Sequence, residues 1–322
     1  METKSQPTFA SIIYQNKKKQ TRREKFLGEM DQVVPWGKLV KLVKPHYPKG
    51  EQGRPPMKLE TMLRIYFLQQ WFNLSDPAME DGLYDMESMR RFAGLELGVD
   101  EVPDETTILH FRHLLERHRL TEKIFAKVNH HLHERGLLMR QGTIVDATII
   151  AAPSSTKNED KQRDPEMSST RKGGQWHFGM KLHIGVDAQS GLTHTAKVTT
   201  AKVHDSQVMG DLLHYEEKAV YGDKAYADEE LRQAYAQEKV AWRILRKAKR
   251  GRKLTKRDQE WNRRHSQVRS RVEHVFQVIK TLWGHNKVRY RGLAKNEAQC
   301  YSLLALANLY RARKALLPVA AN

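Results

Sequence analysis

Apolar side chains in the first 140 residues recur at the spacing of helices. Leu59, Met62, Leu63 and Tyr66 fall on one face of such a helix. Capping residues and prolines indicate further helix ends, because they satisfy or remove the free N–H groups of a first turn. These signals are Ser75-Asp76-Pro77, Pro103-Asp104, a cap at Thr121 and a stop at Gly136. We predict an all-helical amino-terminal domain over residues 1–140, which is either a DNA-binding and assembly module or a plain helical bundle.

After Gly142 the hydrophobic pattern becomes that of strands. Residues 143–150 are rich in β-branched side chains, and residues 177–187 alternate apolar with polar before turning into a second strand at 192–200. The polar stretch 152–175 predicts a long functional or disordered connection. The later elements are expected in the order helix 205–215, strand 219–221, helix 228–238, strand 240–245, helix 261–283 and helix 296–316. This order indicates an α/β domain over residues 141–322.

Composition restricts the class of protein. The 322 residues include 56 Lys and Arg against 38 Asp and Glu, a formal net charge of +18. A surplus of this size indicates a polyanionic partner, most often nucleic acid. The single cysteine, Cys300, excludes a disulfide scaffold or a Cys-rich zinc site. Without a signal peptide or a membrane-length apolar stretch, we expect a soluble intracellular protein with no membrane partner.

The positive charge is concentrated in one segment. Residues 241–295 hold 18 Lys and Arg but only three acids. The densest run, residues 246–253, is called the basic loop here; its cations are Arg246, Lys247, Lys249, Arg250, Arg252 and Lys253. Such a run is either a solvated surface or a set of phosphate contacts. The scarcity of offsetting acids favours phosphate contacts.

Three carboxylates stand out against their surroundings. Asp146 lies inside an apolar strand, where a charge is costly unless it is paired, binds a metal or faces solvent on an edge strand. Asp223 ends a short strand and could equally cap a turn. Glu273 is the sole acid of its basic helix, where Arg269 and Lys280 share its stripe, and it could equally form a surface ion pair. Together the three suit a pair of Mg²⁺ ions, which bind oxygen ligands and support phosphodiester chemistry.

Aromatic and histidine side chains offer further candidates. Trp176, Trp242 and Trp283 could stack on an unpaired base near a cut end, although core packing is the simpler interpretation of Trp242. His177 and His183 are expected on the outward face of their strand, where they either meet DNA or belong to an ordinary sheet surface. The histidines between residues 110 and 133 lack fixed zinc-ligand spacing, so no zinc site is predicted.

Short motifs in order along nearly the whole chain carry a family resemblance. The amino-terminal ones are Pro35-Trp36, Gly53-Arg54-Pro55-Pro56, Leu59 to Arg64, Asn73 to Asp76 and Pro103 to Thr107. The later ones are Val145 to Thr148, Ala152 to Lys157, Gln175 to Lys181, His204-Asp205, Gly222-Asp223 and Arg289 to Leu293. The chain resembles bacterial insertion-sequence transposases of the DDE class, specifically the insertion sequence 5 family.

This resemblance implies an RNase H-like catalytic core, a mixed sheet flanked by helices. It further implies that Asp146, Asp223 and Glu273 form the catalytic triad and bind two Mg²⁺ ions, for which Mn²⁺ can substitute.

The family signature around the glutamate, Tyr-x2-Arg-x3-Glu-x6-Lys, implies phosphate contacts from Arg269 and Lys280. Ser266 stands where the signature has tyrosine, so a tyrosine contact to DNA is not carried over. Within the motif from Gln175 to Lys181, we expect Trp176 and Lys181 to contact DNA.

The expected function is a DNA transposase that cuts at the terminal inverted repeats of its element and joins the 3′-hydroxyl ends to target DNA. Its partner is double-stranded DNA, and holding two ends together implies a homodimer or a larger assembly. The expected location is the bacterial cytoplasm, in association with the nucleoid. Two alternatives remain: a metal-dependent nuclease that never joins strands, and a non-catalytic repressor derived from a transposase.

Overall fold

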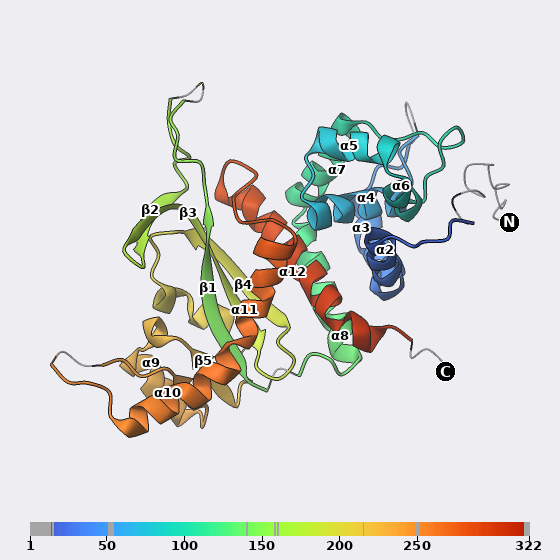
Figure 1. The fold of residues 1–322 in the computed structure, drawn as a ribbon. Helices are drawn as coiled ribbons and strands as arrows, with labels where there is room; N and C mark the ends of the chain where they lie inside the picture. Colours follow the sequence, from blue (N-terminus) through green and yellow to red (C-terminus); the bar gives the residue numbers. More distant parts are fainter. Residues whose placement is uncertain are drawn as a thin grey trace.

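The structure, a computed structural model, describes residues 14–318 apart from residues 15, 51–54, 140, 158, 160, 215, 249 and 250. Helices make up its amino-terminal part (Figure 1). They are α2 (Arg22–Val33), α3 (Trp36–Val43), α4 (Leu59–Phe72), α5 (Asp76–Asp85), α6 (Glu87–Ala93), α7 (Glu105–Arg117) and α8 (Leu120–Glu134), with a 3₁₀ turn at Lys44–His46. The prediction of a helical amino-terminal region is therefore confirmed.

Local capping chemistry sets several of these helix boundaries. The Ser75 hydroxyl accepts a hydrogen bond from the Ala78 N–H, and the Asp104 carboxylate accepts one from the Thr107 N–H, as expected of N-caps. The predicted cap at Thr121 is wrong. Helix α8 already begins at Leu120, because Arg119 adopts a left-handed backbone conformation with φ of 50° that reverses the chain directly after α7.

A mixed six-stranded sheet forms the second part of the chain. Its strands are β1 (Thr143–Ala151), β2 (Ser168–Lys172), β3 (Gln175–Asp187), β4 (Thr193–Thr200), β5 (Ala219–Gly222) and β6 (Ala241–Ile244). The order is β2-β3-β1-β5-β6, and β4 also pairs with β3. Strand β1 runs antiparallel to β3 and parallel to β5, and β5 runs parallel to β6. The predicted mixed α/β fold is confirmed.

One strand departs from the sequence-based expectation. β2 lies inside the polar stretch 152–175, which predicts a connection without strands, and it pairs with the first five residues of β3. Its sequence, Ser168 to Lys172, has no apolar residue, so the hydrophobic alternation that marks a strand is missing. Backbone pairing with β3 alone defines it.

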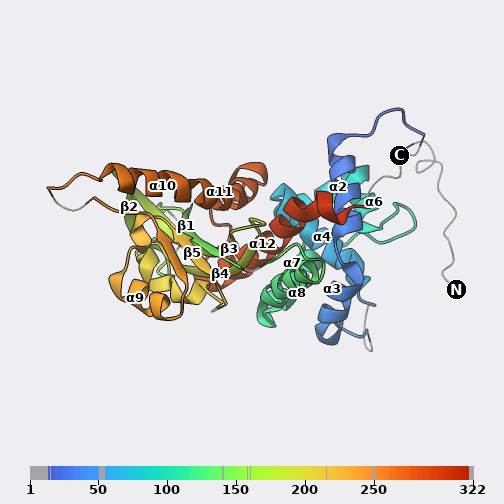
Figure 2. The same ribbon diagram turned by 90° about the horizontal axis from the view of Figure 1, so that it is seen from below.

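Helices cover both faces of the sheet (Figure 2). On one face lie α10 (Lys256–Arg269) and α11 (Arg271–Phe276), and on the other lies α9 (Glu229–Gln237). Short 3₁₀ turns, η2 (Asp205–Val208), η3 (Gly210–Leu212) and η4 (Lys224–Tyr226), join α9 on its side. Residues 205–212 thus form two short turns instead of the single helix expected over 205–215.

The predicted helix 261–283 is longer and is interrupted. It begins at Lys256, breaks between α10 and α11, and continues as the π-helical segment η5 (Gln277–Leu282). Because π-helical turns are wider than α-helical turns, residues after Phe276 leave the α-helical phase. Leu282, near the end of this segment, is 56% exposed.

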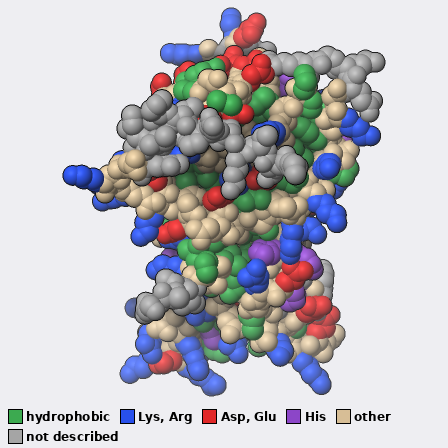
Figure 3. Space-filling model, turned by 90° about the vertical axis from the view of Figure 1, so that its right-hand side faces the viewer, with side chains coloured by type: hydrophobic (Ala, Val, Ile, Leu, Met, Phe, Trp, Pro, Cys, Tyr) green, Lys and Arg blue, Asp and Glu red, His purple; other side chains and the backbone are tan. Residues whose placement is uncertain are grey.

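The last helix, α12 (Leu293–Leu316), joins the two parts of the molecule. It packs against β4 of the sheet and against α2, α4 and α8 of the amino-terminal part. Figure 3 shows the amino-terminal side of the molecule, where Lys and Arg side chains are interspersed with Asp and Glu. In the part of the chain that the structure describes, no helix is long and apolar enough to cross a membrane.

Candidate active site

Asp146 lies on an interior strand of the sheet. β1 is flanked by β3 and β5, so the alternative of a solvent-facing position on an edge strand is wrong. The side chain is only 13% exposed. It accepts a hydrogen bond of 2.8 Å from the Ala147 N–H and forms an ion pair with the Arg269 guanidinium. The Asp146 carboxylate is thereby held in place by the backbone N–H of the next residue and by Arg269 of α10, a helix that crosses the sheet.

The sheet register places Asp146 and Asp223 at equivalent positions on neighbouring strands. The last paired residues of β1 and β5 are Ile144 and Tyr221. Asp146 follows Ile144 by two residues, and Asp223 follows Tyr221 by two residues. Because side chains alternate along a strand, each aspartate leaves the sheet on the same face as the paired residue of its own strand. Both carboxylates therefore lie just beyond the point where the two strands separate, on the face covered by α10 and α11.

Helix α11 contributes the third carboxylate. Glu273 is 58% exposed, and its Oε1 atom lies 3.5 Å from Nη2 of Arg269. The same guanidinium pairs with Asp146 through Nη1. Arg269 therefore stands between two of the three predicted catalytic carboxylates, and the ion pair expected as an alternative role of Glu273 is present.

The pKa of Asp146 depends in part on the other two acids. Burial raises the pKa of Asp146 to about 6. Arg269 and the Ala147 N–H act to lower this pKa, whereas the negative charges of Glu273 and Asp223 raise it further. Both acids therefore lie near enough to Asp146 to act on its charge.

Asp223 also acts as a cap. Its Oδ1 atom accepts a hydrogen bond of 2.7 Å from the Ala225 N–H at the start of η4. The capping role expected as an alternative is thus real, and it fixes the side chain while leaving its second oxygen for another partner.

The three carboxylates do not form a ready metal cluster. Among the described residues, no three His, Cys, Asp or Glu side chains are grouped closely enough to hold a metal ion as they stand. The donor set nevertheless suits a hard divalent cation, since it consists of carboxylate oxygens. Two of the three carboxylates, Asp146 and Glu273, share Arg269 as a positive counter-charge.

Two other predicted DNA contacts are engaged inside the protein. Lys280 donates hydrogen bonds to the Thr148 hydroxyl and the Ile149 carbonyl of β1, at 3.2 and 3.0 Å. Its pKa is lowered, mainly by burial. Lys181 of β3 donates to the Val203 carbonyl and to the Asp205 carboxylate, at 2.7 and 2.8 Å. Lys280 thereby ties η5 to β1, and Lys181 ties β3 to the turn that follows β4.

The remaining predicted contacts differ in exposure. Trp176 is 72% exposed where β2 and β3 meet, whereas Trp283 is buried. Trp242 is half-buried and stacks on Tyr235, with ring centroids 5.8 Å apart. In the basic loop the exposed cations are Arg246, Lys247, Arg252 and Lys253; Lys249 and Arg250 lie outside the described residues, as do Gly53 and Arg54.

Sequence reasoning missed a polar cluster behind Asp146. Tyr226 is fully buried, and its hydroxyl has no hydrogen-bond partner among the described residues. Burial raises its pKa, and the negative charges of Asp205, Asp146 and Asp223 raise it further. His183 is buried as well, which corrects its expected outward position, and burial lowers its pKa to about 4. In the sequence, the indication of this cluster was that Tyr226 follows Asp223 by three residues.

Comparisons with known proteins agree with these features. The family model described as "Transposase DDE domain" matches residues 138–309, and the model described as "Transposase domain (DUF772)" matches residues 15–114. A solved structure described as "Cryo-EM structure of piggyBac transposase synaptic complex with hairpin DNA (SNHP)" is 10% identical in sequence. The likeness covers 91% of this chain and 74% of that chain at a TM-score of 0.47.

Proposed function

Because the chain belongs to the family of transposase DDE domains, we propose that this transposase cuts DNA at the terminal inverted repeats of its own element and joins the freed 3′-hydroxyl ends to target DNA. The observation that carries the proposal is the register of β1 and β5, which puts Asp146 and Asp223 at equivalent positions beyond the last strand pair. Helix α11 then supplies Glu273 on the same face.

In this proposal Asp146, Asp223 and Glu273 hold two divalent cations, Mg²⁺ or in its place Mn²⁺. When bound, such a pair of ions activates the attacking oxygen and stabilises the leaving one. The protein's own contribution is positional: the Ala147 and Ala225 N–H groups each fix one aspartate oxygen. The second oxygen of each aspartate is then the one that would bind a cation, and in Asp146 this oxygen pairs with Arg269 until then. No side chain becomes covalently attached to DNA.

We assign two states to Arg269. Without DNA it neutralises Asp146 and lies beside Glu273. With DNA in place it exchanges the Asp146 carboxylate for a phosphate oxygen, which a guanidinium can bind through two parallel hydrogen bonds. The ion pair with Arg269 therefore provides the Asp146 carboxylate with a counter-charge until substrate binds.

Substrate DNA is held mainly by the basic loop in this proposal. Lys247, Arg252 and Lys253 are exposed there and available to phosphates, and Arg246 is exposed but paired with Asp258. Lys181 and Lys280 support the strands of the site instead of reaching for DNA, since both already bond to backbone carbonyls. Trp176 stays a proposed DNA contact because its ring is exposed.

We further propose the biological setting that the insertion sequence 5 resemblance implies. The protein works in the bacterial cytoplasm at the nucleoid, as a homodimer or larger assembly that holds two element ends. Residues 1–140 serve DNA binding and assembly and residues 141–322 serve catalysis, although α12 packs against both parts.

The decisive experiment incubates the protein with Mg²⁺ and short duplexes that carry the terminal inverted repeats of the element. Cleavage followed by joined product is expected for the wild type, and neither is expected for Asp146→Ala. Cleavage without joined product identifies a nuclease instead. Binding with no chemical difference between the two proteins contradicts the enzymatic function and identifies a repressor.

A further inference from the structure

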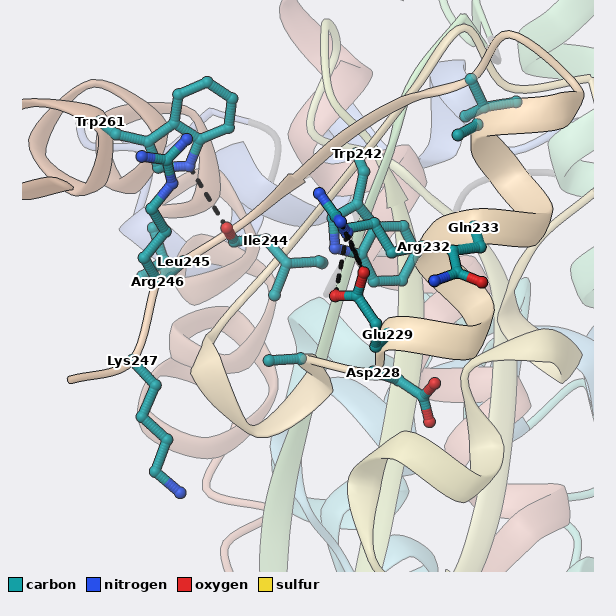
Figure 4. A pocket seen from close by; sticks show the side chains of 13 residues that line it. Asp228, Glu229, Arg232, Gln233, Trp242, Ile244, Leu245, Arg246, Lys247 and Trp261 are labelled. Atoms are coloured by element: carbon teal, nitrogen blue, oxygen red, sulfur yellow. Dashed lines mark hydrogen bonds and ion pairs between the residues drawn. The ribbon is translucent and has the colours of Figure 1, made fainter. Parts of the chain in front are cut away.

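A pocket of about 670 Å³ opens at the outer edge of the sheet, where β6 meets α9 and α10. Figure 4 shows the side chains that line it. Strand β6 is the last strand of the sheet on this side, so no neighbouring strand closes the pocket. It is separate from the three carboxylates, none of which lines it.

Two indole rings are fixed in the pocket wall. Trp242 of β6 stacks on Tyr235 of α9, with ring centroids 5.8 Å apart and planes inclined by 25°. Trp261 of α10 donates its Nε1–H to the Ile244 carbonyl at 3.3 Å. Rings that are held in place this way lose little freedom when a flat ligand stacks on them.

Charge in the pocket favours an anion at its mouth. The two acids that line it are already engaged: Asp228 caps α9 through hydrogen bonds of 3.0 and 3.1 Å, and Glu229 pairs with Arg232. Arg246 lies over the Trp261 ring at 4.5 Å, pairs with Asp258 and opens the basic loop. Lys247, the next residue, is exposed, and its side chain extends away from the two rings in Figure 4.

Flat aromatic walls beside exposed cations are the combination that binds an unstacked nucleotide. A base stacks on the rings whatever its identity, and its phosphate contacts the basic side chains. We propose that this pocket receives one unpaired nucleotide of the DNA substrate, with its base against Trp242 and its phosphate at Arg246 and Lys247. This inference rests on the proposed function in taking DNA as the partner.

Helix geometry relates the pocket to the active site. Trp261 precedes Arg269 by eight residues on α10, which is about 12 Å along the helix axis. The same length corresponds to roughly four nucleotides of one strand of B-form DNA. A strand whose phosphate lies at Asp146 can thus present an unpaired nucleotide to the pocket within a few positions of the cut.

The test compares two fluorescently labelled duplexes that differ only in one bulged thymidine. With the full chain, anisotropy titration is expected to give roughly tenfold tighter binding of the bulged duplex, the size of one base–aromatic stack. Trp242→Ala is expected to abolish this preference while leaving the affinity for the paired duplex unchanged. Trp242→Phe keeps an aromatic ring on Tyr235 and is expected to retain most of the preference.

A second measurement does not depend on the stability of any variant. The bulged base is replaced by 5-iodouracil, and irradiation of the wild-type complex is expected to cross-link it to the peptide that contains Trp242. Equal affinity for the two duplexes, a preference that survives in Trp242→Ala, or cross-links confined to other peptides each overturn the inference. If the paired duplex is still bound and cut in those cases, the proposed function stands; if no DNA is bound, it fails as well.

Discussion

Arg269 of α10 pairs with Asp146 of β1 across the face of the sheet, although 123 positions separate them in the chain. Both side chains are largely removed from solvent, with 24% and 13% exposure. Such a pair leaves a poorly solvated charge behind when one partner is removed.

Removing the guanidinium is therefore expected to destabilise the protein. Arg269→Ala is expected to lower the free energy of unfolding by about 2 kcal/mol at pH 7 without metal, since it leaves Asp146 without its counter-charge. Urea denaturation in EDTA measures the change. In the Asp146→Asn background, the same substitution is expected to cost less than about 0.5 kcal/mol. Equal costs in the two backgrounds contradict the pairing.

The raised pKa of Asp146 predicts a pH dependence of stability. Its pKa is about 6 in the folded protein against 3.8 for an ordinary aspartate. Between these values the folded state binds more protons than the unfolded state, so stability falls as pH rises from about 4 to about 6. The resulting loss in the free energy of unfolding is about 2–3 kcal/mol and is complete above pH 6.

Denaturant unfolding of wild type and Asp146→Asn, measured from pH 4 to pH 7 in EDTA, checks this expectation. The asparagine variant lacks the titration, so its stability relative to wild type is expected to increase with pH across this window. Parallel profiles for the two proteins would refute it.

Removal of the Tyr226 hydroxyl, which has no hydrogen-bond partner among the described residues, is expected not to destabilise the protein. A buried hydroxyl without a hydrogen bond costs free energy, so Tyr226→Phe is expected to leave stability unchanged or to raise it by about 1 kcal/mol. Tyr66→Phe is the matched control, because the buried Tyr66 hydroxyl bonds to Ser302 at 2.9 Å. That control is expected to lose about 1 kcal/mol. Thermal and urea unfolding compare the two, and a larger loss for Tyr226→Phe goes against the expectation.

The basic loop is expected to control the salt dependence of DNA binding. Replacing Lys247, Arg252 and Lys253 with alanine should weaken binding and reduce the slope of log K against log salt by about 0.9 for each phosphate that is no longer neutralised. Substituting Lys247 and Lys253 with arginine keeps the charge and is the control, for which the wild-type slope is expected. Binding measured at four or more salt concentrations gives the slopes; an unchanged slope in the alanine variant excludes phosphate binding by these side chains.

Glu273 is expected to separate binding from chemistry. Glu273→Gln preserves the shape of an exposed side chain and removes a negative charge, so DNA affinity should stay within about twofold of wild type or increase. Cleavage in Mg²⁺ should fall by at least about 100-fold, because the amide is a poor ligand for a hard cation. Gel assays on one duplex measure both, and a loss of binding equal to the loss of cleavage would show that Glu273 acts on DNA affinity alone.

The sequence by itself determined most elements and the identity of the unusual carboxylates. Helical periodicity near Leu59, the caps at Ser75 and Asp104, and the alternation along residues 177–187 are local signals, and each produced the expected element. A carboxylate inside an apolar strand is likewise visible without a structure. These features follow from interactions between residues close in the chain.

Tertiary structure decided what surrounds those residues. Only the strand order shows that Asp146 is on an interior strand and in register with Asp223, and only packing shows that Arg269 pairs with it. Likewise, the interior hydrogen bonds of Lys181 and Lys280 depend on partners more than 20 residues away. The pocket at β6 depends on long-range packing as well, because cavities arise between segments and leave no periodic trace within one. β2 pairs with its chain neighbour β3 across the turn Gly173-Gly174, and its polar sequence lacks the hydrophobic alternation that marks a strand.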